Sequence, residues 1–211
     1  MPCDKTVRGG LMDIESLNSM RNGVYNLIKS FFWESPKEED IKAWRAFVAN
    51  LNEDSINKEF DKTISFMKEA LDNSDVESIK NEYYELFENP FGEGLSNLNA
   101  SFLLEGKNFG KPLVEIRDFL EDLKVVKDTD YKDTEDSILF MIDLMLYLID
   151  SGNCADLQQN FLEKFLYPSF ERLAEILKTN EKAYFYATAG LFSRDYLEMD
   201  MKFLEGIKSL T

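Results

Sequence analysis

Residues 134–152 read TEDSILFMIDLMLYLIDSG and constrain the fold more strongly than any other part of the chain. Only Asp143 interrupts the long apolar run at the middle of this stretch, and the run is too short to span a bilayer. Thr134 is a good N-cap residue, and Gly152 is typical of the left-handed residue that ends a helix. The stretch therefore predicts a helix over residues 135–151 that is apolar nearly all round and lies at the centre of a bundle.

On both sides of this stretch, apolar residues recur at helical spacing, and no alternating strand pattern competes with them. Ser35 with Glu38, and Ser74 with Glu77, form candidate capping boxes that begin two of the helices. Pro168 is expected to interrupt or kink another helix. The predicted helices cover about residues 13–34, 36–48, 56–71, 74–86, 112–123, 155–177 and 181–207. The fold class predicted from this pattern is all-α, a helical bundle.

Residues 89–111 differ from the rest of the chain, because they contain four glycines, little charge and no sustained period. They predict a long loop around a short element at 101–104, and a loop of this length in a helical protein is often functional. The loop also marks the expected boundary between an N-terminal subdomain of about residues 13–100 and a C-terminal subdomain of about residues 101–211. Residues 1–12 read as a flexible tail.

The composition favours a protein partner over a nucleic acid or a membrane. The chain of 211 residues carries 24 Lys and Arg against 40 Asp and Glu, a net charge of −16. Such a surface repels phosphate backbones and anionic membranes and attracts a basic partner. The simpler interpretation, that acidity only keeps the protein soluble, stays open.

Catalytic and metal chemistry find little support in the sequence. The chain has no histidine, and Cys3 and Cys154 form neither a C-x-x-C pair nor a metal-type cluster, so we expect no metal, no disulfide and no cofactor. Paired carboxylates could still act as acid and base, but with 40 acidic residues chance pairs are expected, and we do not predict an enzyme. Residues 1–20 lack the apolar core of a signal peptide, which predicts a cytoplasmic protein.

Five short segments follow one another in a recognisable order. They are RNGVYNL at 21–27 followed by Pro36, YYELFENP at 83–90, SFL at 101–103, TEDSILFM at 134–141, and FLYP at 165–168 with YFY at 184–186. In this order and spacing they resemble the TorD/DmsD/NarJ family of redox-enzyme maturation chaperones, over about residues 20–204. Asp136 matches the Asp of the family's P-x-D-H segment, whereas Ser137 replaces its His and the Pro is missing.

This resemblance implies an all-helical domain of two subdomains joined by a hinge loop. It implies a cytoplasmic chaperone, not an enzyme, that binds the twin-arginine signal peptide of a molybdopterin oxidoreductase, or the enzyme subunit itself, before export or assembly. Some members of the family dimerise by exchanging segments, so a monomer or a segment-exchanged homodimer is expected, and nucleotide binding has been suggested for others. The alternative is a non-enzymatic scaffold or regulatory adaptor that keeps the fold and binds another client; an enzyme is a third possibility.

The peptide site is expected at the start of the apolar helix and in the loop over residues 89–104. A receptor for a basic and apolar leader needs carboxylates beside an apolar surface. Asp136, Asp143 and Asp150 are spaced by seven residues and so fall near one face of the helix. The candidate peptide-binding residues are Phe87, Pro90, Ser101, Phe102, Asp136, Ser137, Phe140 and Asp143.

Several of these residues also have a purely structural interpretation. The aspartates could form the solvated stripe of a mostly buried helix, Phe87 could belong to the core, and Pro90 could only end a helix. Trp33 and Trp44 are expected in the core.

Overall fold

The computed structural model describes residues 14–51, 57–91, 95 and 97–208. Every regular element within these residues is an α-helix or a π-helical turn, which confirms the all-α prediction. The elements are α1 (Ile14–Phe32), α2 (Glu38–Leu51), α3 (Lys58–Asn73), α4 (Val76–Tyr83), η1 (Tyr84–Glu88), α5 (Ala100–Glu105), α6 (Lys111–Leu123), α7 (Ile138–Asp150), α8 (Ala155–Phe161), η2 (Leu162–Leu166), α9 (Tyr167–Thr179) and α10 (Phe185–Lys208). The predicted tail at 1–12 lies outside the described residues.

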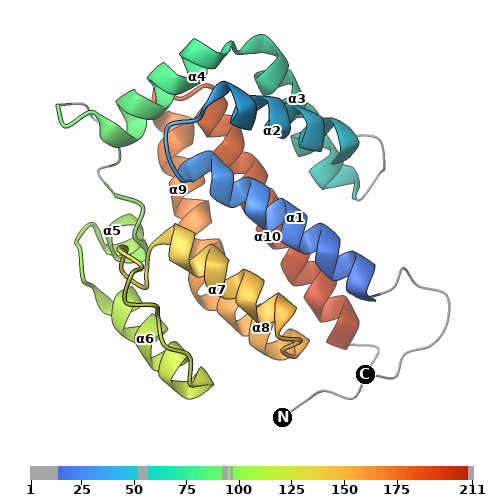
Figure 1. The fold of residues 1–211 in the computed structure, drawn as a ribbon, viewed down its shortest axis with the longest axis vertical. Helices are drawn as coiled ribbons and strands as arrows, with labels where there is room; N and C mark the ends of the chain where they lie inside the picture. The colour runs from blue at the N-terminus through green and yellow to red at the C-terminus, as the bar shows by residue number, and fades with distance from the viewer. Residues whose placement is uncertain (1–13, 52–56, 92–94, 96, 209–211) are drawn as a thin grey trace.

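The long helix α10 forms the axis of the bundle. It packs against α1, α3, α4, α8, α9 and η2, whereas α7 packs against α1, α8 and η2. Figure 1 shows α2, α3 and α4 together at one end, α5 and α6 at the other, and α1 beside α7 in front of α10. The prediction that the apolar helix occupies the centre is therefore wrong, although nine of its 13 residues are buried. The apolar side chains of α7 are buried in its contacts with α1, α8 and η2.

Because α10 packs against α3 and α4 as well as against α8 and α9, it contacts both of the predicted subdomains. The division near residue 100 stays a prediction. Among the residues the structure describes, none of the helices combines the length and the apolar content needed to cross a membrane.

Three helix starts, those of α2, α4 and α7, have a side-chain hydrogen bond from a residue other than the one that the sequence pattern favoured. Asp75, not Ser74, caps α4, and the N–H of Ser78 that it accepts lowers the pKa of the Asp75 carboxyl. Ser137, not Thr134, caps α7, which begins three residues later than predicted. At α2 the Asp40 carboxylate accepts the backbone N–H of Lys37, so the expected Ser35–Glu38 box is shifted by two residues. In each case a polar neighbour a few residues along the chain took the role.

The start of α10 is capped from a distant part of the chain. The carboxylate of Glu82 in α4 accepts the backbone N–H of Phe185 at 3.0 Å and that of Tyr186 at 2.6 Å. Burial raises the pKa of the Glu82 carboxyl, because the charged form loses water that these two hydrogen bonds only partly replace. This contact fixes the end of α4 against the beginning of the central helix.

The interruption expected at Pro168 takes the form of a π-helical turn directly before it. A proline within a helix donates no hydrogen bond, and its ring collides with the carbonyl four residues earlier. At η2 the helix widens instead, and the N–H of Tyr167 reaches the carbonyl of Leu162. The helix therefore continues from α8 into α9 without a break.

Aromatic rings fill the core where α1, α2 and α10 meet. The ring of Phe31 contacts Trp44 at a centroid distance of 5.0 Å and Phe185 at 5.9 Å, and Trp44 is stacked on Phe185. The prediction that Trp44 lies in the core is confirmed. The same prediction for Trp33 is wrong, because its side chain is 51% exposed at the end of α1.

A buried ion pair joins α1 to α10. The Arg21 guanidinium donates to both carboxylate oxygens of Asp200, at 2.7 and 2.9 Å, and the Tyr25 hydroxyl donates to the same carboxylate at 2.8 Å. Both partners of the ion pair are almost fully buried. Burial, together with the carboxylate of Asp200, raises the pKa of Tyr25 well above the ordinary value for tyrosine, so the ring stays neutral. The pair therefore fixes the position of α1 along α10.

Replacing Asp200 by Asn is expected to lower the free energy of unfolding by about 3–5 kcal/mol, because it leaves the Arg21 charge buried without a countercharge. The double variant Arg21→Met with Asp200→Leu should recover part of this loss, because no buried charge remains. Urea unfolding followed by circular dichroism measures both. An Asp200→Asn protein as stable as the wild type would show that the ion pair does not hold α1 on α10.

Candidate functional site

A short bridge fastens the segment before α5 to the segment before α7. Asn99 and Ser137 face each other in an isolated antiparallel bridge. On its two sides, the N–H of Ala100 donates to the carbonyl of Asp136 at 2.7 Å, and the N–H of Ile138 donates to the carbonyl of Leu98 at 3.0 Å. The structure thus brings together two of the segments, 101–103 and 134–138, that the sequence analysis had placed in one site.

Asp136 is the centre of this junction, and its carboxylate is turned inward. The residue is 1% exposed. One carboxylate oxygen accepts the backbone N–H of Ser101 at 3.0 Å, and the other accepts the hydroxyl of Thr134 at 2.6 Å. Within the described part of the chain, no Lys or Arg pairs with it. Asp136 is therefore a buried carboxylate that accepts two hydrogen bonds from neutral donors and has no countercharge beside it.

The other predicted residues of the junction are also largely covered. Ser101 is fully buried, and its hydroxyl has no hydrogen-bond partner. Phe102 is half-buried against the core. The hydroxyl of Ser137 accepts the N–H of Leu139 at 3.3 Å and so caps α7.

A second group of predicted residues lies further along α7, where the helix runs beside α1. The Asp143 carboxylate accepts two hydrogen bonds from the Lys29 ammonium, at 2.7 and 2.8 Å, and one from the Tyr131 hydroxyl at 3.0 Å. The ring of Phe140 lies under Tyr131, edge to face, at a centroid distance of 5.3 Å. Asp143 remains partly open to solvent, since its side chain is 31% exposed.

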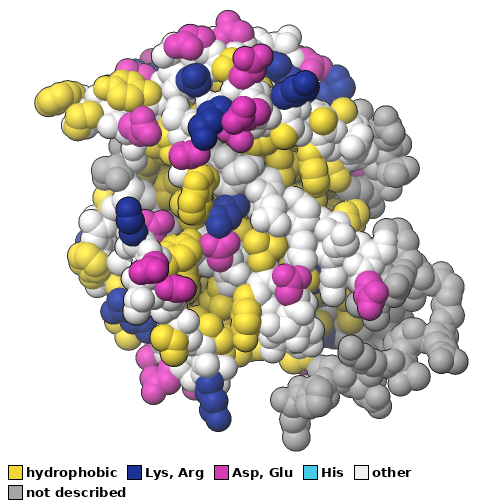
Figure 2. Space-filling view, viewed as in Figure 1, with side chains coloured by type: hydrophobic (Ala, Val, Ile, Leu, Met, Phe, Trp, Pro, Cys, Tyr) yellow, Lys and Arg dark blue, Asp and Glu magenta, His cyan; other side chains and the backbone are white. Residues whose placement is uncertain are grey.

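The same Lys29 ammonium also lies 4.6 Å from the centre of the exposed Trp33 ring. A cation is thus held between a carboxylate and an aromatic face, two groups that each attract positive charge. We call the surface formed by Lys29, Trp33, Tyr131, Asp143 and Tyr147 the α1–α7 face. In Figure 2 hydrophobic side chains emerge among acidic and basic ones along the middle of this side of the molecule.

A small hollow opens beside Trp33, between the end of α1 and the start of α2. It is lined by Asn26, Lys29, Ser30, Trp33, Glu34 and Asp40. Glu34 is exposed, and Asp40 is half-buried. The two carboxylates and the indole ring give the hollow the chemistry of a site for a basic side chain.

Phe87 and Pro90 lie apart from both groups. The Phe87 ring packs edge to face on Phe32 and Tyr186, in the aromatic core at the η1 end of the molecule, so the structural interpretation of this residue holds. Pro90 is exposed just after η1. Figure 1 shows η1 beyond α5, away from α7.

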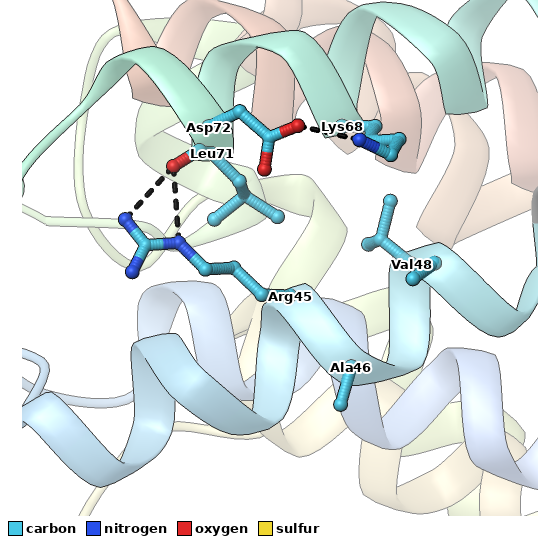
Figure 3. Close-up of a pocket in the computed structure, with 7 residues that line it drawn as sticks. Arg45, Ala46, Val48, Lys68, Leu71 and Asp72 are labelled. Atoms are coloured by element: carbon cyan, nitrogen blue, oxygen red, sulfur yellow. Dashed lines mark hydrogen bonds and ion pairs between the residues drawn. The ribbon is translucent and has the colours of Figure 1, made fainter.

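Another hollow, between α2 and α3, has a structural role (Figure 3). Arg45 spans it and donates to the carbonyls of Leu71 and Ser74, at the end of α3, while Lys68 pairs with Asp72. The charges that line the hollow are thus occupied by one another and by a helix terminus. Across the described ranges, no three Cys, Asp or Glu side chains gather as a metal ion would require.

No sequence pattern singled out Lys29, Tyr131 or the exposed position of Trp33. The signal for Trp33 lay in its place directly before the Glu34–Ser35–Pro36 helix break, where a side chain easily leaves the packed stripe. Nothing in the sequence indicated that Lys29 would reach Asp143 across 114 positions.

A protein-family model and a solved structure both match this chain. A family model described as nitrate reductase delta subunit matches residues 53–175. The crystal structure of a candidate redox enzyme maturation protein from Archaeoglobus fulgidus is similar in fold, with 17% sequence identity and a TM-score of 0.54. That similarity covers 93% of this chain and 99% of the other. No curated protein matches the sequence.

Tyr131 offers a test of the electrostatics around Asp143. Burial, and then the nearby Asp143 charge, raise the pKa of the Tyr131 hydroxyl above the ordinary value for tyrosine. Because the folded state holds this proton more tightly, the stabilisation is fully present below about pH 10 and is lost as the pH rises through the raised pKa. Tyr131→Phe should make the alkaline loss of stability less steep, and Asp143→Asn should lower the pKa of Tyr131.

The measurement is denaturant unfolding of the wild type and the two variants at a series of alkaline pH values. Tyr131→Phe also loses one hydrogen bond, worth about 1 kcal/mol at neutral pH. Identical alkaline slopes for the wild type and Tyr131→Phe would show that Tyr131 is not held neutral by its surroundings.

Proposed function

The chain belongs to the nitrate reductase delta subunit family, and we propose that it is a cytoplasmic maturation chaperone for a redox enzyme. In this proposal it binds a molybdopterin oxidoreductase subunit through its basic, apolar twin-arginine leader and holds it until export or assembly. The role is binding without turnover. Family membership and the shared fold support the general role; the client and the leader are our inference from the surface of the molecule.

The observation that carries the proposal is the way in which Lys29 is held. Its ammonium lies between the Asp143 carboxylate and the Trp33 ring, so the α1–α7 face already binds a cation of its own. Next to it, the Glu34 and Asp40 carboxylates share a hollow with the same indole ring. A guanidinium from a leader would find an aromatic face and charge-assisted acceptors there without new backbone structure.

The exposed aromatic side chains suit the apolar part of the same leader. Trp33 is 51% exposed and Tyr147, one turn beyond Asp143, is 47% exposed. Exposed rings of this size beside carboxylates match a ligand that alternates basic and apolar character. The net charge of −16 adds a long-range attraction for any basic segment.

Trp33→Ala is expected to weaken binding of a leader peptide about tenfold, which corresponds to about 1.4 kcal/mol, because the cation loses its aromatic face. The probe is a synthetic peptide with two adjacent arginines followed by an Ala/Leu stretch, titrated calorimetrically. Phe66→Ala is the matched control, because Phe66 is similarly exposed, at 54%, on α3. Since both side chains are exposed, neither change should unfold the protein.

Raised salt should weaken binding to the wild type, because much of the attraction is between exposed charges. Equal affinities for Trp33→Ala, Phe66→Ala and the wild type would remove the α1–α7 face from the site. Affinity purification from the native cell then identifies the client. A stable partner that is not a redox enzyme would instead favour the scaffold or adaptor alternative.

A further inference from the structure

The junction around Asp136 contains a buried carboxylate without a countercharge and a buried hydroxyl without a hydrogen-bond partner. A carboxylate that is 1% exposed has neutral donors alone, although a buried carboxylate is normally paired with a cation. Ser101, whose N–H donates to this carboxylate, has a fully buried hydroxyl without a hydrogen-bond partner. Buried unpartnered polar atoms are few in folded proteins, and each calls for an explanation. Here both lie where α5 meets the start of α7.

Helix α5 is the element that covers this carboxylate. It has six residues, ASFLLE, and packs against α6 and α9 through buried Ala100 and Leu103. A helix this short is not stable by itself, so its place depends on its contacts. Three hydrogen bonds attach it to the segment before α7, from Ala100 and Ser101 to Asp136 and from Ile138 to Leu98. At its other end, the Glu105 carboxylate accepts the backbone N–H of Lys111 in α6 at 3.4 Å.

The chemistry of α5 corresponds to that of the ligand proposed above. It presents a backbone donor to a carboxylate and, beside it, the buried side chains of Ala100 and Leu103 in the part of the fold where it packs against α6 and α9. A basic and apolar leader presents the same two features, with a stronger donor. The N–H of Ser101 is neutral, whereas a guanidinium would bring the charge that Asp136 lacks.

We propose that α5, together with the bridge at Asn99 and Ser137, is a displaceable latch over a cation-binding site at Asp136. The inference rests on the proposed function and concerns a second contact of the same leader, at Asp136, in addition to the α1–α7 face. When the latch opens, a guanidinium of the client leader replaces the Ser101 N–H on Asp136, and the apolar part of the leader takes the seat of α5 on α6 and α9. Without a client, α5 keeps the apolar seat covered.

The latch makes the apparent affinity depend on the fraction of open molecules. A ligand contact that forms only in the open state is weakened in proportion to that fraction, so closing the latch permanently should remove the part of the affinity that depends on Asp136. This separates the latch from a role of Asp136 in the fold alone, since a purely structural junction could be locked without consequence.

A disulfide across the bridge provides the lock. The flanking hydrogen bonds make Asn99 and Ser137 a non-hydrogen-bonded antiparallel pair, whose Cα atoms lie about 4.5 Å apart and so within the range that a disulfide can span. The double variant Asn99→Cys with Ser137→Cys is prepared in a background with Cys3→Ser and Cys154→Ser. The probe is the same diarginine Ala/Leu peptide, and a copy with glutamines in place of the arginines is the control peptide.

Oxidised protein is expected to lose binding by at least tenfold, and reduction with dithiothreitol should restore it. The single variant Ser137→Cys measures the effect of changing the α7 cap. Equal affinity in the oxidised and reduced forms would overturn the latch and leave the proposed function standing. Failure of the peptide to bind the wild type, the reduced form and the oxidised form alike would overturn both.

Ser101→Ala tests the latch in the opposite direction without a cross-link. It removes the hydroxyl that is buried without a partner in the closed state and would be solvated in the open state, so it should stabilise the closed state. We expect a higher melting temperature together with an affinity for the diarginine peptide several-fold below that of the wild type. A variant with a higher melting temperature and unchanged affinity would contradict the latch. Amide hydrogen exchange at Ala100 and Ser101, which should quicken when the peptide binds, gives an independent measure.

Discussion

The ion pair between Arg21 and Asp200 is the constraint on which the arrangement of the other helices depends. Two long helices with apolar faces can slide along one another at little cost, because hydrophobic contact has no direction. A bidentate guanidinium–carboxylate contact that is buried and supported by the Tyr25 hydroxyl is satisfied in only one register. It therefore determines where α1 stops along α10, and with it every contact that α1 makes elsewhere.

The most important of these contacts is the one with α7. Once α1 is fixed, its outer side chains meet α7 in antiparallel register, so that Asn22 donates to Asp150 and Lys29 to Asp143. Trp33 then comes at the end of α1, beside the Lys29 ammonium and next to the hollow that leads to α2. The aromatic and acidic surface thus follows from a buried interaction nearer the start of the same helix.

Much of this architecture could be predicted from the sequence, because apolar spacing and capping residues act locally. The helices, the short element at α5 and the effect of Pro168 all follow from neighbours a few positions apart. The direction in which the Asp136 carboxylate points could not be predicted, because it depends on the backbone of Ser101, which belongs to a different segment. The exposure of Trp33 and the contact between Lys29 and Asp143 depend in the same way on the register of α1 along α10. Helical periodicity in the sequence does not predict that register.

Asp136, two residues before α7, and Asp143, within it, have the same side chain but different environments. Asp143 is partly exposed and is paired with a flexible lysine, so an incoming cation can share or replace that partner by moving one side chain. Asp136 is buried and is paired through the backbone, so a cation reaches it only if the bridge at Asn99 separates. In the proposed scheme a basic leader is therefore first attracted to the exposed carboxylate and the Trp33 ring, at a rate set by charge. Tight binding comes later, when α5 is displaced. It requires an apolar segment of the leader that replaces the contacts of α5 with α6 and α9. A peptide that is only basic can make the first contact but has no apolar segment to replace α5. An acidic protein can in this way hold its client and release other basic peptides.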